Sequence, residues 1–179
     1  MKILAICAAS MRERVRHAAG VHPKTCPPVN ASMITPACLE GYDLLYFQLH
    51  GLPEQPFWYG DGYETALSAE TIRKANLERS VAFVANCYLP DSPMLDALLG
   101  AGAQAVIGGA GRNFSRKSEL DFADLLGLWV RRGLQAGMGP QLALEVAKLR
   151  MRMQRKSAQR EDTLEFRVWT PAGKKHYVS

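Results

Sequence analysis

Three short apolar runs constrain the fold of this chain more than any other feature. They are "LLYFQL" at 44–49, "VAFVA" at 81–85 and "AVIGG" at 105–109. Their length is that of a strand, and the last two contain almost no polar residue. Strands that are apolar on both faces are typical of parallel sheets covered by helices. Helix-like segments separate the runs, as parallel crossovers require. The sequence therefore predicts an α/β fold, with a mostly parallel central sheet and helices on both faces.

Capping residues and apolar spacing predict the helices between these strands. Ser10 is available as the N-cap of the first helix, and Asp91 or Ser92 as that of a helix before the third run. A long amphipathic helix is expected within 118–137. Pro140 opens a further helix, whose apolar stripe consists of Leu142, Val146, Leu149 and Met153.

Two segments rich in glycine and proline, 20–30 and 51–66, are predicted loops. The second is long enough to be of a kind that is often functional. The segment 163–170 alternates in polarity and is predicted to be an edge strand.

The chain has 179 residues, 47% of them hydrophobic, which suits a single domain over residues 1–179. Residues 171–179 are predicted to form a flexible tail. No apolar run approaches the roughly 20 residues that a membrane span needs. The first segment is apolar and then basic, which is the wrong order for a signal peptide, so we expect a cytoplasmic protein without membrane association.

The charge and the cysteines exclude several classes of function. A net charge of +5 favours acidic partners only mildly. Solvated helix faces account for the basic residues, and no reading motif accompanies them, so nucleic acid is not an expected partner. The four cysteines form no C-x-x-C pair and have no histidine at zinc-finger spacing, so no metal site is expected.

His50 and Cys87 stand where the first two apolar runs end. In parallel sheets, active sites lie at the carboxyl ends of the strands, so both side chains are expected on the same rim. A thiolate is a strong nucleophile, and a nearby histidine assists it. The N–H groups of Gly51 and Cys87 are candidate donors to an oxyanion. This set suits a cysteine hydrolase that acts on a peptide, whereas the alternative is a structural histidine and a buried cysteine.

The order of these segments resembles that of the caspase-like cysteine peptidases of clan CD, and most closely that of CHAT domains. The similar segments include "YDLLYFQLHG", "SVAFVANC", "LLGAGAQAVIGG" and "FADLLGLWVRRGLQAGMGPQLALEVAKL". The resemblance implies a caspase-like three-layer sandwich. It implies an endopeptidase that cleaves protein substrates through a dyad of His50 and Cys87, with an oxyanion hole at the N–H groups of Gly51 and Cys87. It requires no metal or organic cofactor, and it implies a protein or peptide substrate and a regulatory partner such as a repeat protein.

Two alternatives remain beside a peptidase. The residues around the dyad depart from the family pattern, because "QLHG" and "ANCYLPDS" replace the usual "AGHG" and the acidic or polar residue after cysteine. A catalytically inactive CHAT-like module that binds another protein is therefore the second candidate. A doubly wound nucleotide-binding domain ranks last, because "CAASMRER" lacks the glycine pattern.

Substrate contacts and regulation are predicted in the loops around the dyad. Trp58 is expected to wall a peptide groove, and Asp61 and Asp91 to attract a basic side chain; a surface loop and a helix cap are the alternatives. Ordering or cleavage of the segments 52–64 and 111–118 is predicted to switch activity. The basic cleavage points are Arg112, Arg116 and Lys117.

Overall fold

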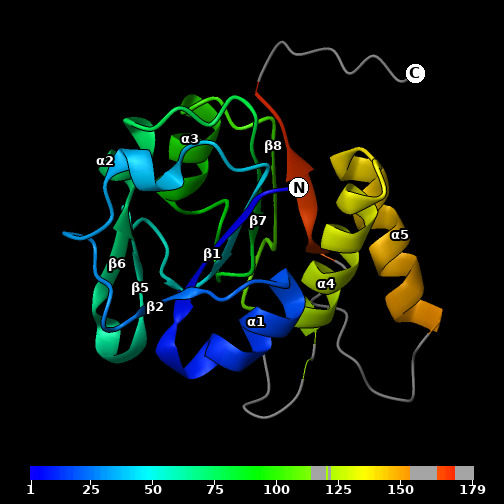
Figure 1. Cartoon of the computed structure of the whole chain (residues 1–179), viewed down its shortest axis with the longest axis horizontal. Coiled ribbons are helices and arrows are strands. Elements are labelled where there is room, and N and C mark those ends of the chain that lie inside the picture. Colours follow the sequence, from blue (N-terminus) through cyan, green and yellow to red (C-terminus); the bar gives the residue numbers. More distant parts are fainter. Residues whose placement is uncertain (114–119, 121, 154–164, 172–179) are drawn as a thin grey trace.

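A six-stranded sheet runs through the centre of the protein, in the strand order β2-β1-β3-β7-β8-β9 (Figure 1). Neighbouring strands are parallel, except that β9 pairs antiparallel with β8 at one edge. The structure is a computed structural model that describes residues 1–113, 120, 122–153 and 165–171. The strands of the central sheet are β1 (Ile3–Ala8), β2 (Lys24–Cys26), β3 (Leu44–Gln48), β7 (Val81–Val84), β8 (Ala105–Gly108) and β9 (Arg167–Trp169).

Helices cover both faces of this sheet, as the sequence predicted (Figure 1). One face carries α2 (Ala69–Arg73) and α3 (Pro93–Gly100), and the other carries α1 (Arg12–Ala19), α4 (Phe122–Gln135) and α5 (Pro140–Met153). Phe47 and Val84 belong to the first apolar cluster, while Tyr46 and Phe83 belong to the second. Alternate side chains of β3 and β7 are thus buried on opposite faces, which is why these runs are apolar throughout.

A second, antiparallel sheet forms in the segment that was predicted to be a loop. It consists of β4 (His50–Gly51), β5 (Phe57–Tyr59) and β6 (Thr65–Ser68), with short 3-10 turns elsewhere at Ala9–Met11, Pro36–Leu39 and Asp61–Tyr63. Trp58 of β5 and Leu67 of β6 face each other and are buried in the core. Tertiary burial therefore forms these strands, which are too short to show an alternating pattern.

The loop prediction at 20–30 also misses a strand. Three residues of this segment, β2, pair with the end of β1, so that Ala8 lies opposite Cys26. Proline-rich sequence on either side is tolerated because β2 is at the edge of the sheet, where one row of backbone groups needs no partner.

One of the two predicted helix caps is present. The Ser92 hydroxyl accepts a hydrogen bond from the N–H of Met94, 3.3 Å away, at the start of α3. Ser10 caps no helix. It precedes α1 in a 3-10 turn, and it donates hydrogen bonds to the carboxylate of Asp61 instead. The long-range contact has displaced the local one.

Glycines on α4 allow close packing of the sheet and the helices. A Cβ at Gly127 would lie 2.5 Å from the hydroxyl oxygen of Tyr46 and 2.8 Å from the ring of Phe83. A Cβ at Gly133 would lie 3.0 Å from the Cβ of Ala143 on α5. The main chain of α4 at Gly127 therefore packs directly against the aromatic side chains of Tyr46 and Phe83. The helices α4 and α5 pack against each other through the small residues Gly133 and Ala143.

The helix predicted from Pro140 is confirmed as α5, but its predicted stripe does not face the core. Leu142, Leu149 and Met153 are 56%, 54% and 79% exposed. The buried side of α5 consists of Ala143, Leu144, Ala147 and Met151. Alanines face α4 because the two helices approach closely, and the larger side chains are left on the outside.

Two further predictions concern the ends of the chain and the membrane. The predicted tail at 171–179 lies, apart from Pro171, outside the described residues. Among the helices of the described part of the chain, none is long and apolar enough to cross a lipid bilayer.

We expect Gly127→Leu to lower the free energy of unfolding by about 1–3 kcal/mol, because the new side chain overfills the contact with Tyr46 and Phe83. Urea unfolding followed by circular dichroism measures the change. Gly100→Leu on α3 is the matched control, since nothing lies within 4 Å of a Cβ there. A change for Gly127→Leu no larger than that of the control would contradict the packing described.

Candidate active site

The pairing of β3 with β7 brings His50 and Cys87 to the same place. Phe47 and Val84 form the last pair of this ladder. His50 follows Phe47 by three residues, and Cys87 follows Val84 by three. Both side chains line one pocket of about 40 Å³, together with residues from the ends of β3 and β7 and from the neighbouring segments: Met11, Gln48, Leu49, Ala85, Asn113 and Ala123. The two residues predicted as a dyad therefore line the same pocket at the carboxyl edge of the sheet.

Asn86, buried directly before Cys87, ties the two strand ends together. Its Oδ1 accepts a hydrogen bond of 2.7 Å from the N–H of Leu49, directly before His50. This contact takes over where the regular ladder ends, and it fixes the positions of the two following residues relative to each other. Sequence reasoning did not single out Asn86. The available signal was an amide side chain at the end of an otherwise apolar run.

Gly51 lies against the main chain of the cysteine. A Cβ at this position would be 2.3 Å from the carbonyl oxygen of Cys87. A residue with a side chain would force the two segments apart, so the absence of a side chain is required here. The main chain after β3 and the main chain after β7 are therefore in direct contact.

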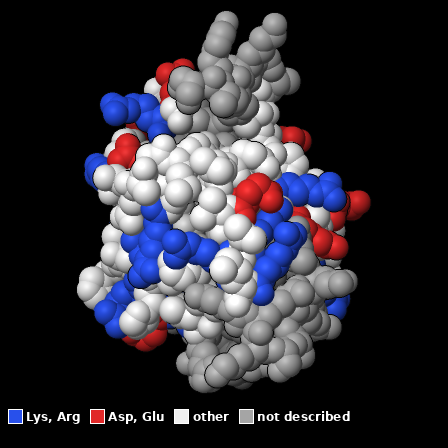
Figure 2. Space-filling view, turned by 90° about the vertical axis from the view of Figure 1, so that its right-hand side faces the viewer, with Lys and Arg blue, Asp and Glu red and all other residues white. Residues whose placement is uncertain are grey.

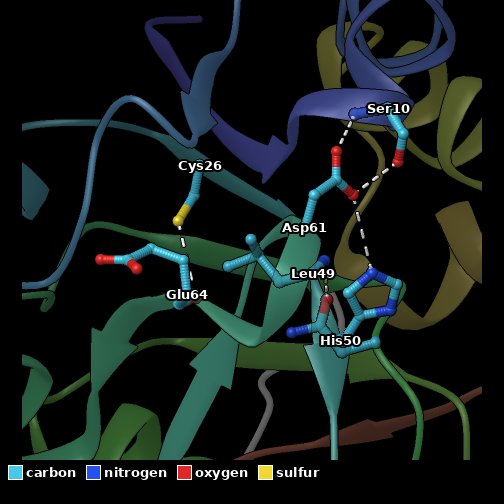
Figure 3. A network of polar contacts seen from close by, with 7 residues as sticks. Ser10, Cys26, Leu49, His50, Asp61 and Glu64 are labelled. Carbon is cyan, nitrogen blue, oxygen red and sulfur yellow. Dashed lines mark hydrogen bonds and ion pairs between the residues drawn. The ribbon is translucent and has the colours of Figure 1, made fainter.

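Asp61 lies beside the imidazole of His50 and is held by Ser10 (Figure 3). Its Oδ1 is 3.9 Å from Nε2 of His50. Ser10 donates from its N–H to Oδ2 and from its hydroxyl to Oδ1, both at 2.7 Å. Asp61 was predicted to attract a substrate, but these contacts favour a role in orienting the imidazole, because a group that holds the base is the usual third member of such a site.

Asn113 covers the thiol of Cys87. Its N–H donates to Sγ at 3.3 Å, and its carbonyl oxygen is 3.7 Å from Sγ. Its side-chain amide donates to the carbonyl oxygens of Asn86, at 2.6 Å, and Ala85, at 3.2 Å. Asn113 therefore binds the main chain of the two residues before the cysteine as well as its thiol, and it lines the pocket. Its place after a glycine-rich run gave no signal for this role.

The neighbouring residues add to this cover. Nε of Arg112 donates to the hydroxyl of Tyr88 at 2.6 Å, and the N–H of Tyr88 donates to the carbonyl oxygen of Gly111 at 2.9 Å. Of the predicted switch segment 111–118, only the residues up to 113 are described. Two of the predicted cleavage points, Arg116 and Lys117, lie outside the described residues.

The structure does not support Trp58 as a wall of a substrate groove. Its side chain is fully buried, and its ring centroid lies 5.0 Å from that of Phe47. The prediction was wrong because a side chain that is fully buried in the core cannot contact a substrate. The aromatic residue beside the site is Tyr63, which is 69% exposed and whose ring centroid is 6.3 Å from that of His50.

Asp91 is exposed and does not line the pocket. Its main-chain oxygen accepts a hydrogen bond of 2.7 Å from the N–H of Glu54, and it is Ser92 rather than Asp91 that caps α3. The structure thus places Asp91 on the surface beyond the cysteine, where the segments after β4 and before α3 meet.

Buried polar side chains lie under the pocket. Nε2 of Gln48 donates to Oδ1 of Asp124 at 2.5 Å, and Oδ2 of Asp124 is 3.6 Å from Arg14. The network joins β3, α4 and α1 beneath the site, and sequence reasoning missed it. Within the described ranges, no three side chains of His, Cys, Asp or Glu stand close enough together to hold a metal ion.

Comparison with known proteins identifies the fold. No family model and no curated protein matches the sequence. Among solved structures, the chain is similar to separase in the crystal structure of the Saccharomyces cerevisiae separase–securin complex, with a TM-score of 0.56 and 11% sequence identity. The similarity covers 95% of this chain but only 12% of the separase chain. The predicted caspase-like α/β fold is confirmed, whereas the resemblance to CHAT domains remains a prediction.

The four thiols differ in burial, and we expect them to react with iodoacetamide in two classes. Burial raises the pKa of Cys7 to about 12 and also raises the pKa of Cys26. The Thr35 hydroxyl, 3.3 Å from the sulfur of Cys38, lowers the pKa of that half-buried thiol. Since the thiolate is the reactive form, Cys38 and the half-buried Cys87 should be alkylated first near neutral pH.

Peptide mass spectrometry after brief alkylation of the folded protein measures this order. Denatured protein is the control, in which all four cysteines should react. Alkylation of Cys7 at the rate of Cys87 in the folded protein would contradict the burial described.

Proposed function

We propose that the protein is a cysteine endopeptidase of the caspase-like CHAT type, which cleaves protein substrates through His50 and Cys87. The observation that carries this proposal is that both residues line one pocket at the carboxyl ends of β3 and β7. The similarity of the fold to that of separase supports it. Neither metal nor organic cofactor is needed for this chemistry.

The proposed reaction begins with attack of Cys87 Sγ on the carbonyl carbon of the scissile peptide bond, while the thiol proton passes to His50. His50 then protonates the leaving amine, and a thioester to Cys87 remains. A water molecule, deprotonated by His50, hydrolyses the thioester and restores the thiol. The N–H groups of Gly51 and Cys87 stabilise the oxyanion in both steps.

Asp61 is proposed to position the base. With Nε2 of His50 beside its carboxylate, the imidazole presents its other nitrogen away from Asp61. A carboxylate in this position stabilises the imidazolium that forms when the thiol proton is transferred. Ser10, two residues after the end of β1, holds the carboxylate through two hydrogen bonds.

Substrate binding requires the segment 111–113 to move. A pocket of about 40 Å³ holds a few water molecules and no peptide side chain. Displacement of Asn113 frees the Cys87 thiol and opens the pocket toward Tyr63. Asp91, on the surface after β7, is proposed to attract a basic substrate side chain. Ordering of 111–113 away from the thiol would then be the step that activates the enzyme.

A catalytically inactive, protein-binding module is the second candidate. The observation that favours it is the cover of the Cys87 thiol by both main-chain groups of Asn113. In this function the fold presents a surface to a partner such as a repeat protein, and the dyad has no substrate. The crystallised separase is itself in a complex with a protein, securin.

Loss of the dyad should abolish cleavage. With a peptide library and mass spectrometric detection, we expect Cys87→Ala and His50→Ala to reduce the cleavage rate by about 10³-fold or more, since nucleophile and base act as a unit. Circular dichroism should show unchanged secondary structure. Cys38→Ser is the matched control and should cleave at the wild-type rate. Cleavage that persists in both dyad variants would rule out the proposed mechanism, and a wild type that cleaves nothing would favour the inactive module.

Asp61→Asn should retain the fold and lower kcat by about 10- to 100-fold, a part of the roughly 10²–10⁴-fold that general acid–base catalysis contributes. Because the imidazole loses the carboxylate that orients it, the loss should fall on kcat, with little change in KM. Asp91→Asn serves as the comparison, and it should raise KM for basic substrates with little change in kcat. A loss in Asp61→Asn that falls on KM instead, or an unchanged kcat, would exclude the positioning role.

A further inference from the structure

The helix α5 is apolar on two opposite sides, and one of them is uncovered. Ala143, Leu144, Ala147 and Met151 are buried against the body of the protein. On the opposite side, Leu142, Leu149 and Met153 are 56%, 54% and 79% exposed, and Val146 is half-buried. A helix that is apolar on both sides is typical of a buried helix. Since α5 is the outermost element on this side of the protein (Figure 1), its outer side has no partner among the residues that the structure describes.

The four outer residues have the spacing of a coiled-coil seam. They are separated by four, three and four positions, so Val146 and Met153 take heptad position a, and Leu142 and Leu149 take position d. Among parallel coiled coils, a β-branched residue at a, here Val146, with leucine at d favours a pair of helices. We call these four side chains the outer seam.

The charges beside the outer seam complement each other between two copies of the chain. Glu145 occupies position g, and Arg150 occupies the next position e. In a parallel pair, position g of one helix faces position e of the following heptad on the other. Glu145 of each copy therefore faces Arg150 of the other, and a two-fold axis gives this contact twice.

The Arg150 side chain is stacked against α4, and Glu145 lies 3.2 Å from Lys148 within its own helix. The guanidinium of Arg150 lies over the ring of Trp129, 4.5 Å from the centroid, and Arg132 lies over the same ring at 4.7 Å. Stacking holds the Arg150 side chain beside the seam and reduces the entropy that is lost on binding. Figure 2 shows that Lys and Arg side chains gather on this face of the molecule, with acidic side chains and uncharged surface between them.

We propose that the outer seam of α5 binds α5 of a second copy of this chain, as a parallel and symmetric pair of helices. A membrane surface fits less well, because such helices have a broad apolar side with a basic polar side opposite it. Here the opposite side is packed in the core, the seam is narrow, and Glu145 lies beside it. The proposal is independent of the proposed peptidase activity.

The dimer should be weak. Four side chains on a helix of 14 residues bury less than the roughly 1,200–2,000 Å² of a stable interface. Sedimentation equilibrium from about 1 µM to about 1 mM should show the mean mass rising from 19.8 kDa toward twice that value. Leu149→Lys should weaken the association by at least about tenfold, while Leu52→Lys, at another exposed leucine, should leave it unchanged.

Charge exchange tests the parallel register without touching the apolar seam. Glu145→Arg and Arg150→Glu should each weaken the dimer, the double variant should restore it, and a mixture of the two single variants should form heterodimers. Circular dichroism checks that each variant is folded. A wild type that stays monomeric throughout, a dimer insensitive to Leu149→Lys, or a double variant without rescue would overturn the proposal. Binding to anionic vesicles that is lost in Leu149→Lys would assign the seam to a membrane instead.

Discussion

The in-register parallel pairing of β3 with β7 is the constraint on which the candidate site depends. Because Phe47 lies opposite Val84, any two residues at equal distances beyond this pair leave the sheet at the same height. His50 and Cys87 meet this condition, and Asn86 maintains it after the ladder ends by binding the N–H before His50. A shift of one residue in this register would turn the alternating side chains of the shifted strand to the opposite face of the sheet. The core and the site are therefore specified by the same hydrogen bonds.

The sequence was sufficient to predict most of the central sheet, its helices and the edge of the sheet at which His50 and Cys87 lie. A strand that is buried on both faces is apolar along nearly its whole length, so it is visible in the sequence. Because such strands are parallel, their carboxyl ends lie at the same edge of the sheet. No such signal marks β2 or the small sheet. These strands of two to four residues exist because Trp58, Leu67 and Cys26 are buried by the rest of the protein, which a local pattern does not reveal.

The errors at the site and on α5 have a common physical cause. In "FWYGDGY" every aromatic residue is equally suited to a core or to a groove, and the structure buries Trp58 while it exposes Tyr63. Likewise, α5 has two apolar sides, so periodicity predicts a helix but not which side faces inward. Asp61 and Asn113 act through contacts with residues far away in the sequence. Asp61 contacts Ser10, and Asn113 contacts Cys87. No spacing of residues in the sequence predicts either contact.

The contacts that build the site join residues far apart in the sequence, and this separation determines when the site forms during folding. Ser10 and Asp61 are 51 residues apart, Leu49 and Asn86 are 37 apart, and Cys87 and Asn113 are 26 apart. Contacts of such separation incur a large loop-closure entropy and form after local structure. A partly folded chain therefore contains the imidazole and the thiol without their common geometry. Under the proposed function, the ribosome and the nascent chain itself are not exposed to proteolysis before the fold is nearly complete.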